Sequence, residues 1–376
     1  MFELKKELIL VNGVNTHFGG SGKESLSYWT QSLYKKKINF DLFNTVPIFY
    51  FKKNSVFYKM ILFLYFMPGS LFRIFPTVFF EFFYKISFFS IFNFLFIKKG
   101  IFDKKIIFSH HSIFYLSFFI NKRRRIFLIH DLLFIRSWSF MKCRRLKKII
   151  FKFEIWLYKR AELLLVLSYQ EKRILSKFIK KKIILISCED LKLSDNLIFK
   201  EIEFEKITQS NVYSVVSDWR RKENRHGILF FLNSDDCQKY NGPLITFKIY
   251  GYNSDNLCKS LEFISNPKIC IINMGEFPSY RSIEFNIFFI PIYQGAGIKL
   301  KTIEAFRNCR YVIGTKGAFL GLPPDIIKHV SQKVTSLECL ASRRSIPYLS
   351  VKNFQETFLL LSKHYANISD VNFYAY

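Results

Sequence analysis

The sequence lacks an uncharged apolar run long enough to cross a bilayer, since a spanning helix needs about 18–20 such residues. In its Phe-rich region the longest charge-free run is Met60–Phe72, and the run Ile106–Asn121 contains His110 and His111. We also expect no secretory leader, because charged residues open the sequence and the apolar run after them covers only Leu8–Val11. We therefore expect a cytoplasmic protein without a membrane-spanning segment.

Paired cysteines and acidic side chains are scarce as well. The seven cysteines form no Cys-x-x-Cys pair, so the sequence indicates neither a disulfide framework nor a zinc module, and a reduced compartment fits best. Asp and Glu number 29 against 57 Lys and Arg, which gives a formal net charge of +28. This charge favours an anionic partner: nucleic acid, an acidic membrane surface or a diphosphate substrate. The chain has no recognisable nucleic-acid-binding motif, and its Lys and Arg are spread along its whole length.

Apolar residues are abundant by contrast, and 376 residues suffice for two domains. The segment Ser55–Ile97 is crowded with phenylalanine, carries few charges and is flanked by lysine pairs. A helix that is apolar on several faces lies either deep in a core or against lipid. Because flanking lysines suit acidic headgroups, we expect this segment to dock on an anionic membrane surface. An overfilled protein core is the alternative.

The clearest pattern in the chain covers Phe289–Leu322. An apolar run, Ile287–Ile292, is broken by a glycine turn, and apolar residues then recur at helical spacing from Ile298. A second apolar run, Tyr311–Ile313, follows the helix. The order strand, glycine turn, helix and strand predicts a βαβ unit.

The glycine turn suits an anion. Glycines ahead of a helix let backbone amides approach a phosphate, and the positive end of the helix favours the same charge. Lys299 and Lys301 lie where a phosphate needs a cation. Glu304, one turn further along the helix, is placed to accept hydrogen bonds from sugar hydroxyls. An ordinary βαβ unit with a tight turn is the alternative.

The pattern Gly-x-Gly-Ile-Lys-x-Lys-x-x-Glu-Ala, followed by a Val-Ile-Gly-Thr strand, resembles the donor-binding half of retaining GT-B glycosyltransferases of group 1 type, which include surface-polysaccharide transferases. These enzymes move sugars from nucleotide diphosphates onto glycans and lipids. The resemblance implies that Gly295, Gly297 and Lys299 bind the donor diphosphate and that Glu304 binds the ribose. The chain departs from the family pattern at Ala296, Asn308, Cys309 and Tyr311. These departures raise the alternative of an inactive relative.

A glycine-rich loop follows the first predicted strand, Leu8–Val11. Such a loop is where a doubly wound domain binds a ligand. By the resemblance, the loop faces the cleft between two domains and brings His17, Gly19 and Gly20 to it. A loop histidine in solvent is the alternative for His17. A P-loop is excluded, because Glu24 stands where that motif needs Ser or Thr.

A predicted strand at Ile126–Ile129 delivers His130 and Asp131 at its carboxyl end, where ligands bind a parallel sheet. The resemblance implies that His130 contacts the transferred sugar, with Asp131 steadying it, so both are candidate catalytic residues. The alternative is a metal site that also includes His110 and His111. Adjacent pairs do not converge easily on one ion, so we expect no metal.

The second half of the chain opens after a polar, aperiodic stretch, Cys188–Ser210, which places the domain boundary near Asn211. The predicted strand Val212–Ser217 then leads into a basic loop. In the family this loop brings a basic residue to the donor diphosphate, and the candidates are Arg220, Arg221 and Lys222. A solvated basic loop is the alternative.

We therefore predict an α/β protein with the GT-B fold, in which two Rossmann-like parallel-sheet domains face each other across a cleft. Residues 1–210 form an acceptor-side domain and residues 211–350 the nucleotide-sugar domain. A closing helix within residues 351–376 packs back on the first domain.

The expected function is transfer of a sugar from a nucleotide-diphosphate donor to a glycan or a polyprenyl-diphosphate-linked acceptor in surface polysaccharide assembly. The resemblance implies a retaining, metal-independent, hexosyltransferase-type reaction on the inner face of the cell membrane. The donor is a substrate, and neither a cofactor nor a specific nucleic acid is expected. The alternatives are a catalytically weakened GT-B partner subunit and a basic protein that binds nucleic acid without specificity.

Overall fold

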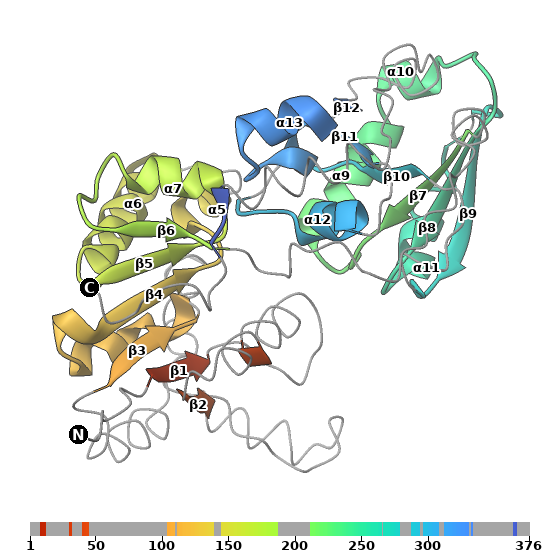
Figure 1. Cartoon of the computed structure of the whole chain (residues 1–376). Coiled ribbons are helices and arrows are strands. Elements are labelled where there is room, and N and C mark those ends of the chain that lie inside the picture. Colours follow the sequence, from red (N-terminus) through yellow and green to blue (C-terminus); the bar gives the residue numbers. More distant parts are fainter. Residues whose placement is uncertain are drawn as a thin grey trace. The chain divides into compact units, whose positions relative to one another are not determined.

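The computed structural model describes residues 8–12, 30–31, 40–44, 104–109, 111–138, 144–186, 211–264, 266–278, 287–293, 296–307, 312–330, 332–333 and 364–366. The chain forms two compact units (Figure 1). Unit 1 comprises residues 1–190 and 365–376, and unit 2 comprises residues 191–364. The Phe-rich segment Ser55–Ile97 and the polar stretch before Asn211 lie outside the described residues. Membrane docking of that segment and the boundary at Asn211 therefore stay predictions.

Unit 1 is built on a parallel sheet with the strand order β2-β1-β3-β4-β5-β6. The strands are β1 (Leu8–Asn12), β2 (Phe40–Asn44), β3 (Lys105–Phe108), β4 (Arg125–Ile129), β5 (Leu163–Val166) and β6 (Ile183–Leu185). The helices described in this unit are η4 (His111–Phe119), η5 (Lys122–Arg124), α5 (Leu133–Trp138), α6 (Arg144–Tyr158) and α7 (Tyr169–Leu175). The winding of the chain reverses between β1 and β3. Ligands of such sheets bind at this reversal, outside the carboxyl ends of the strands.

β5 is apolar throughout and β4 is apolar after Arg125, as expected for a parallel sheet with both faces covered. Every residue of β4 and β5 is buried. Phe127 of β4 stacks on Phe114 of η4 with ring centroids 4.3 Å apart, and the Tyr158 ring of α6 meets both at its edge. This aromatic cluster joins η4 and α6 to the middle of the sheet.

Unit 2 is built on a second parallel sheet with the strand order β12-β11-β10-β7-β8-β9. Its strands are β7 (Val212–Val216), β8 (Ile245–Tyr250), β9 (Ile269–Gly275), β10 (Ile287–Ile290), β11 (Val312–Gly314) and β12 (Gln332–Lys333). Its helices are α9 (Lys222–Leu232), α10 (Asp235–Gln238), α11 (Ser254–Lys259), α12 (Leu300–Arg307), η6 (Lys316–Phe319) and α13 (Pro324–Val330). The winding reverses between β7 and β10, so the loops after these two strands are the expected ligand-binding loops. The predicted α/β class is confirmed in both units.

The loop after β10 is packed tightly against its neighbours. A methyl group added at Gly227 of α9 would lie 1.9 Å from the carbonyl oxygen of Pro291, and one at Gly317 of η6 would lie 1.8 Å from that of Ile292. Thr315 Oγ1 also donates a hydrogen bond to the Ile292 carbonyl. Two glycines on different elements therefore allow the backbone after β10 to lie against α9 and η6.

Near its end the chain pairs with unit 1. The Ala366 backbone N–H donates to the Leu185 carbonyl at 2.9 Å, in a parallel bridge between Ile186 and Ala366, and Tyr365 is buried. The rest of the predicted closing helix, apart from His364, lies outside the described residues. Among the helices that the structure describes, none has both the length and the apolar character needed to cross a membrane.

The packing at Gly227 predicts that Gly227→Ala destabilises unit 2, although alanine favours a helix over glycine by about 1 kcal/mol. The added methyl group has no room beside Pro291, and overpacking of this kind costs about 1–3 kcal/mol. Urea unfolding measures the change, and His226→Ala, at the exposed neighbouring position of α9, is the control. A Gly227→Ala protein as stable as His226→Ala would contradict the close contact.

Candidate functional site

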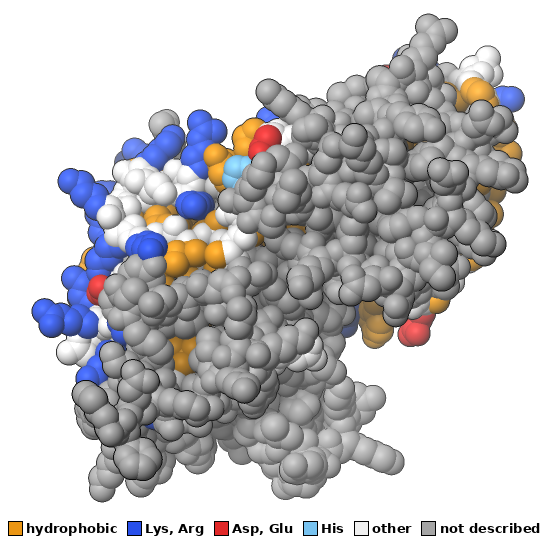
Figure 2. Space-filling model, viewed as in Figure 1, with side chains coloured by type: hydrophobic (Ala, Val, Ile, Leu, Met, Phe, Trp, Pro, Cys, Tyr) orange, Lys and Arg blue, Asp and Glu red, His pale blue; other side chains and the backbone are white. Residues whose placement is uncertain are grey.

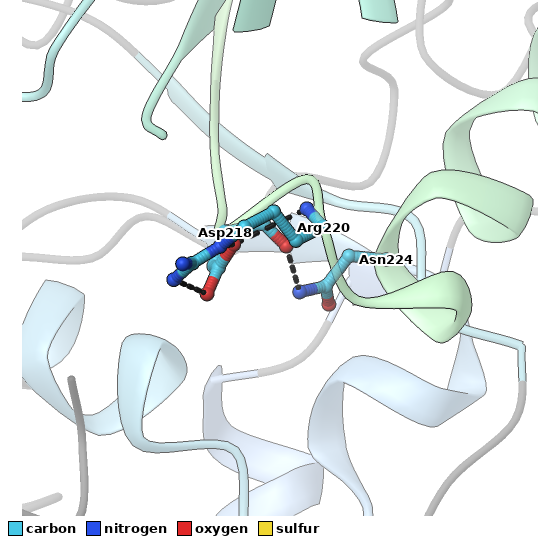
Figure 3. Close-up of polar contacts among 3 residues, drawn as sticks. All are labelled: Asp218, Arg220 and Asn224. Atoms are coloured by element: carbon cyan, nitrogen blue, oxygen red, sulfur yellow. Dashed lines mark hydrogen bonds and ion pairs between the residues drawn. The ribbon is translucent and has the colours of Figure 1, made fainter. Parts of the chain in front are cut away.

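The loop after β7 is held by its own side chains. Trp219 is buried and its indole N–H donates to the Tyr250 carbonyl at 2.8 Å. Asp218 bonds Arg220 twice, from Arg220 Nε to Oδ1 at 2.9 Å and from Nη2 to Oδ2 at 2.8 Å. The Asn224 side-chain amide donates to the Asp218 carbonyl at 3.0 Å (Figure 3). This network fixes the path of the backbone from β7 into α9.

Arg220 is engaged within that network. Besides its paired bonds to Asp218, its guanidinium carbon lies 4.1 Å from the centre of the Tyr252 ring. The hydrogen bonds from Arg220 lower the pKa of the Asp218 carboxyl below its ordinary value. All three basic candidates in this loop are exposed, and Arg220 contacts Asp218 and Tyr252. Their predicted role at the donor diphosphate stays a prediction.

The loop after β10 leads into α12 through a left-handed backbone at Gly297, where φ is 70°. Lys299 turns back onto this loop, because its Nζ donates to the Ala296 carbonyl at 2.8 Å. Glu304 is half-buried on α12, one turn beyond the start of the helix. Gly295 lies outside the described residues, so its predicted role stays a prediction.

Lys301 of α12 connects the loop after β10 with the loop after β7. Its Nζ donates to Ser217 Oγ after β7 and lies 3.4 Å from Asn224 Oδ1 of α9. Lys301 thereby contacts two side chains that are 84 and 77 positions away in the sequence, at the point where the winding of the sheet reverses. These side-chain contacts link the start of α12 with the segment from the end of β7 to the start of α9.

The Lys301 ammonium lies in a desolvated and electropositive place. Its pKa is lowered to about 7, mainly by burial and then by the positive charges of Lys299 and Arg221, while Glu223 acts in the opposite direction. A lysine with this pKa becomes fully charged when an anion binds beside it. The end of β7 and the start of α12 therefore bring together cations and backbone amides that suit a phosphate group.

The sequence predicts that both Lys299 and Lys301 bind a phosphate, and this role stays a prediction. The structure adds Ser217 and Asn224, which contact the Lys301 ammonium. The sequence alone does not show that the Lys301 ammonium contacts the loop after β7. The predicted cleft-loop residues of unit 1, His17, Gly19 and Gly20, lie outside the described residues.

His130 and Asp131 lie at the carboxyl end of β4, as predicted. Burial lowers the pKa of the His130 imidazole, while the charge of Asp131 and a hydrogen bond with the Ser109 backbone act in the opposite direction. Ser109 follows β3, so the ends of two neighbouring strands meet at this histidine. Within the residues that the structure describes, no group of three or more His, Cys, Asp or Glu side chains is placed to hold a metal ion.

Two buried glutamates hold the turn after His130 and Asp131. Glu171 of α7 accepts the Leu132 N–H at 2.9 Å, and Glu154 of α6 accepts those of Leu133 and Phe134, both at 2.9 Å. Glu154 also accepts the Tyr158 hydroxyl at 2.7 Å. These carboxylates satisfy the amide groups at the start of α5, which a helix cannot satisfy internally.

Burial raises the pKa of Glu154 to about 7, although its hydrogen bonds act in the opposite direction. Because the folded-state pKa lies above the unfolded value, the stabilisation is complete below about pH 4.5 and is lost as the pH rises towards about 7.

We predict that the stability of the protein decreases between about pH 5 and about pH 7, and that Glu154→Gln removes much of this decrease while lowering stability at pH 5. Urea unfolding at the two pH values measures both effects. Glu262→Gln, at an exposed position of unit 2, should keep the pH dependence of the unchanged protein. The same pH dependence in Glu154→Gln would show that Glu154 titrates normally.

Comparison with solved structures gives matches over nearly the whole chain. A mutant of S. aureus TarM in complex with Fondaparinux, alpha-GlcNAc-glycerol and UDP superimposes with a TM-score of 0.59 at 12% identity, over 96% of this chain and 97% of the other. Sucrose-phosphate synthase from Thermosynechococcus elongatus gives 0.55 at 12% identity, over 95% and 94%. Anabaena HepE in complex with UDP gives 0.52 at 13% identity, over 96% and 95%.

No family model matches the sequence, and no curated protein matches it either. At such low identity the structural matches establish the fold, and its two parallel α/β units agree with the fold expected from the sequence. The chain therefore has the GT-B fold of these glycosyltransferases.

Proposed function

We propose that the protein is a glycosyltransferase that moves a sugar from a nucleoside-diphosphate donor to a glycan or lipid-linked acceptor. The observation that carries this proposal is the Lys301 contact with Ser217, which joins two cation-bearing loops at the winding reversal of unit 2. Solved structures with the same fold include complexes with UDP and with UDP-glucose. UDP-sugars are therefore the donors to test first.

In this proposal the donor diphosphate lies between the start of α12 and the start of α9. The Gly295–Gly297 loop supplies backbone amides, and Lys299, Lys301 and Arg221 supply positive charge. Glu304 accepts hydrogen bonds from the ribose hydroxyls. Because side-chain cations neutralise the diphosphate, we propose that the reaction needs neither a metal ion nor a cofactor.

In unit 1, we propose that His130 contacts the transferred sugar and that Asp131 holds the histidine in place. Both residues lie at the end of a buried strand, and the turn behind them is fixed by Glu154 and Glu171. Retention of the anomeric configuration is part of the proposal and rests on the resemblance in sequence pattern.

The proposed acceptor is a surface glycan or a polyprenyl-diphosphate-linked precursor of one, at the inner face of the cell membrane. The TarM mutant with the same fold was solved in complex with alpha-GlcNAc-glycerol and UDP, which supports testing glycan acceptors. The net charge of +28 favours an anionic surface over a neutral one. The protein would then reach its acceptor as a peripheral membrane protein.

We predict that Lys301→Ala weakens UDP-glucose binding by about 1.5–3 kcal/mol, the range for a charge-assisted hydrogen bond, and that Lys299→Ala does the same. Calorimetric titration in the presence of EDTA measures the affinity and tests the metal-independent proposal in one experiment. Lys268→Ala, at an exposed position away from these loops, should bind like the unchanged protein. Unaltered affinity in Lys301→Ala would remove this residue from the site.

The pKa of Lys301 also predicts how donor binding depends on pH. Since its pKa is about 7 without a ligand, the ammonium is charged below this pH and increasingly neutral above it. UDP-glucose affinity should therefore decrease between about pH 7 and about pH 9, and this decrease should be smaller in Lys301→Ala. The diphosphate diester of UDP-glucose does not itself titrate in this range. Equal pH profiles in both proteins would refute the role of Lys301.

A further inference from the structure

The outward face of α6 in unit 1 is both basic and apolar. Exposed residues recur at helical spacing, and they are Arg145, Lys148, Ile149, Lys152 and Trp156. The opposite face is buried and includes Ile150, Ile155 and Leu157. An ordinary surface helix keeps its outward face polar. Here that face carries an aliphatic and an aromatic side chain among its cations.

An aromatic cluster extends this face beyond α6. The Trp156 ring centroid lies 5.9 Å from that of Phe118 in η4 and 5.8 Å from that of Phe153. Trp156 is 44% exposed, Phe118 is 41% exposed and Ile149 is 53% exposed. Exposed apolar side chains that lie together, in contrast to single ones, indicate an interaction site.

A cation is built into the cluster. The Arg160 guanidinium carbon lies 4.3 Å from the centre of the Trp156 ring and 5.6 Å from that of Phe118. We call the set Arg145, Lys148, Ile149, Lys152, Trp156, Phe118 and Arg160 the basic–aromatic face. The acidic residue of α6, Glu154, is fully buried and does not offset these charges at the surface. Figure 2 shows Lys and Arg side chains along the side of unit 1 that carries α6 and α7, with apolar side chains among them.

We propose that the basic–aromatic face is a docking surface for an anionic lipid bilayer. Trp156, Phe118 and Ile149 would enter the boundary between headgroups and acyl chains, where indole rings are favoured. Lys148 and Lys152 have long apolar stems that let their ammonium groups reach the lipid phosphates. This inference rests on the proposed function only in so far as that function calls for a membrane-bound acceptor.

The same chemistry fits a bilayer better than a nucleic acid. Single-stranded nucleic acids bind where aromatic faces are open for bases to stack. Arg160 already lies over the Trp156 ring, and Ile149, the most exposed apolar residue of the face, has no ring to stack. An aliphatic side chain that is half exposed beside lysines is suited to acyl chains.

The test is sedimentation of the full chain with phosphatidylcholine vesicles that do or do not contain phosphatidylglycerol. Lys148→Glu/Lys152→Glu should weaken binding to the anionic vesicles roughly tenfold or more, since each basic residue near the surface contributes to the attraction. The control, Lys259→Glu/Lys268→Glu, changes the net charge equally at exposed positions of unit 2 and should weaken binding less than about threefold.

A second pair of variants tests the apolar part. Trp156→Ala should weaken binding roughly threefold or more at high salt, where the electrostatic attraction is screened and the apolar one is not. Phe263→Ala is the matched control, because Phe263 is 86% exposed in unit 2. Circular dichroism and UDP-glucose affinity, both unchanged in every variant, would show that folding and the proposed donor site are intact.

Four results would overturn the proposal. The first is that the unchanged protein does not bind anionic vesicles. The second and third are that vesicle binding weakens equally in the Lys148/Lys152 and Lys259/Lys268 double variants, or equally in Trp156→Ala and Phe263→Ala. The fourth is that single-stranded RNA binds through the same residues more tightly than the vesicles do. Failure of the proposed function would appear differently, as absent UDP-glucose binding in a protein that still sediments with anionic vesicles.

Discussion

Close backbone contact after β10 is the constraint on which the candidate site depends. The backbones of α9 and η6 lie so close to the loop after β10 that a side chain at Gly227 or Gly317 would have no room beside Pro291 or Ile292. This contact fixes the start of α9 relative to the end of β10, and therefore relative to the start of α12. Lys301 can then reach Ser217 and Asn224 across the winding reversal. Lys301 and the basic residues at the start of α9 lie close together because the backbone segments that carry them are packed closely.

Unit 1 positions its candidate residues by a different means. There the turn after β4 is held by carboxylates, which accept the amide groups of Leu132, Leu133 and Phe134. Burying Glu154 costs free energy that is offset by three hydrogen bonds, and the balance raises its pKa to about 7. The same helix that buries Glu154 presents Trp156 and Lys152 on its outward face. One helix thus supports both the His130 turn and the proposed docking surface.

Much of the fold was predictable from the sequence, because buried parallel strands are continuous apolar runs and helices begin after glycine turns. β4, β7 and β10 were all expected from such runs, although β7 ends at Val216 and β10 at Ile290, one and two residues before the predicted ends. The sequence could not show that Arg220, unlike its neighbours Arg221 and Lys222, contacts the Asp218 and Tyr252 side chains. Nor could it place the Lys301 ammonium, whose partner Ser217 lies in a distant segment. Side-chain pairing across a sheet is set by tertiary packing, which local patterns do not encode.

We propose that a nucleotide-sugar diphosphate binds where the segment after β7 meets the start of α12. A crystal structure of the protein with UDP-glucose would show where the diphosphate lies. The account predicts diphosphate oxygens within hydrogen-bonding distance of Lys301 Nζ and of the amide groups at the start of α12, with the ribose beside Glu304. A diphosphate bound elsewhere, with Lys301 still contacting Ser217 and Asn224, would contradict this assignment.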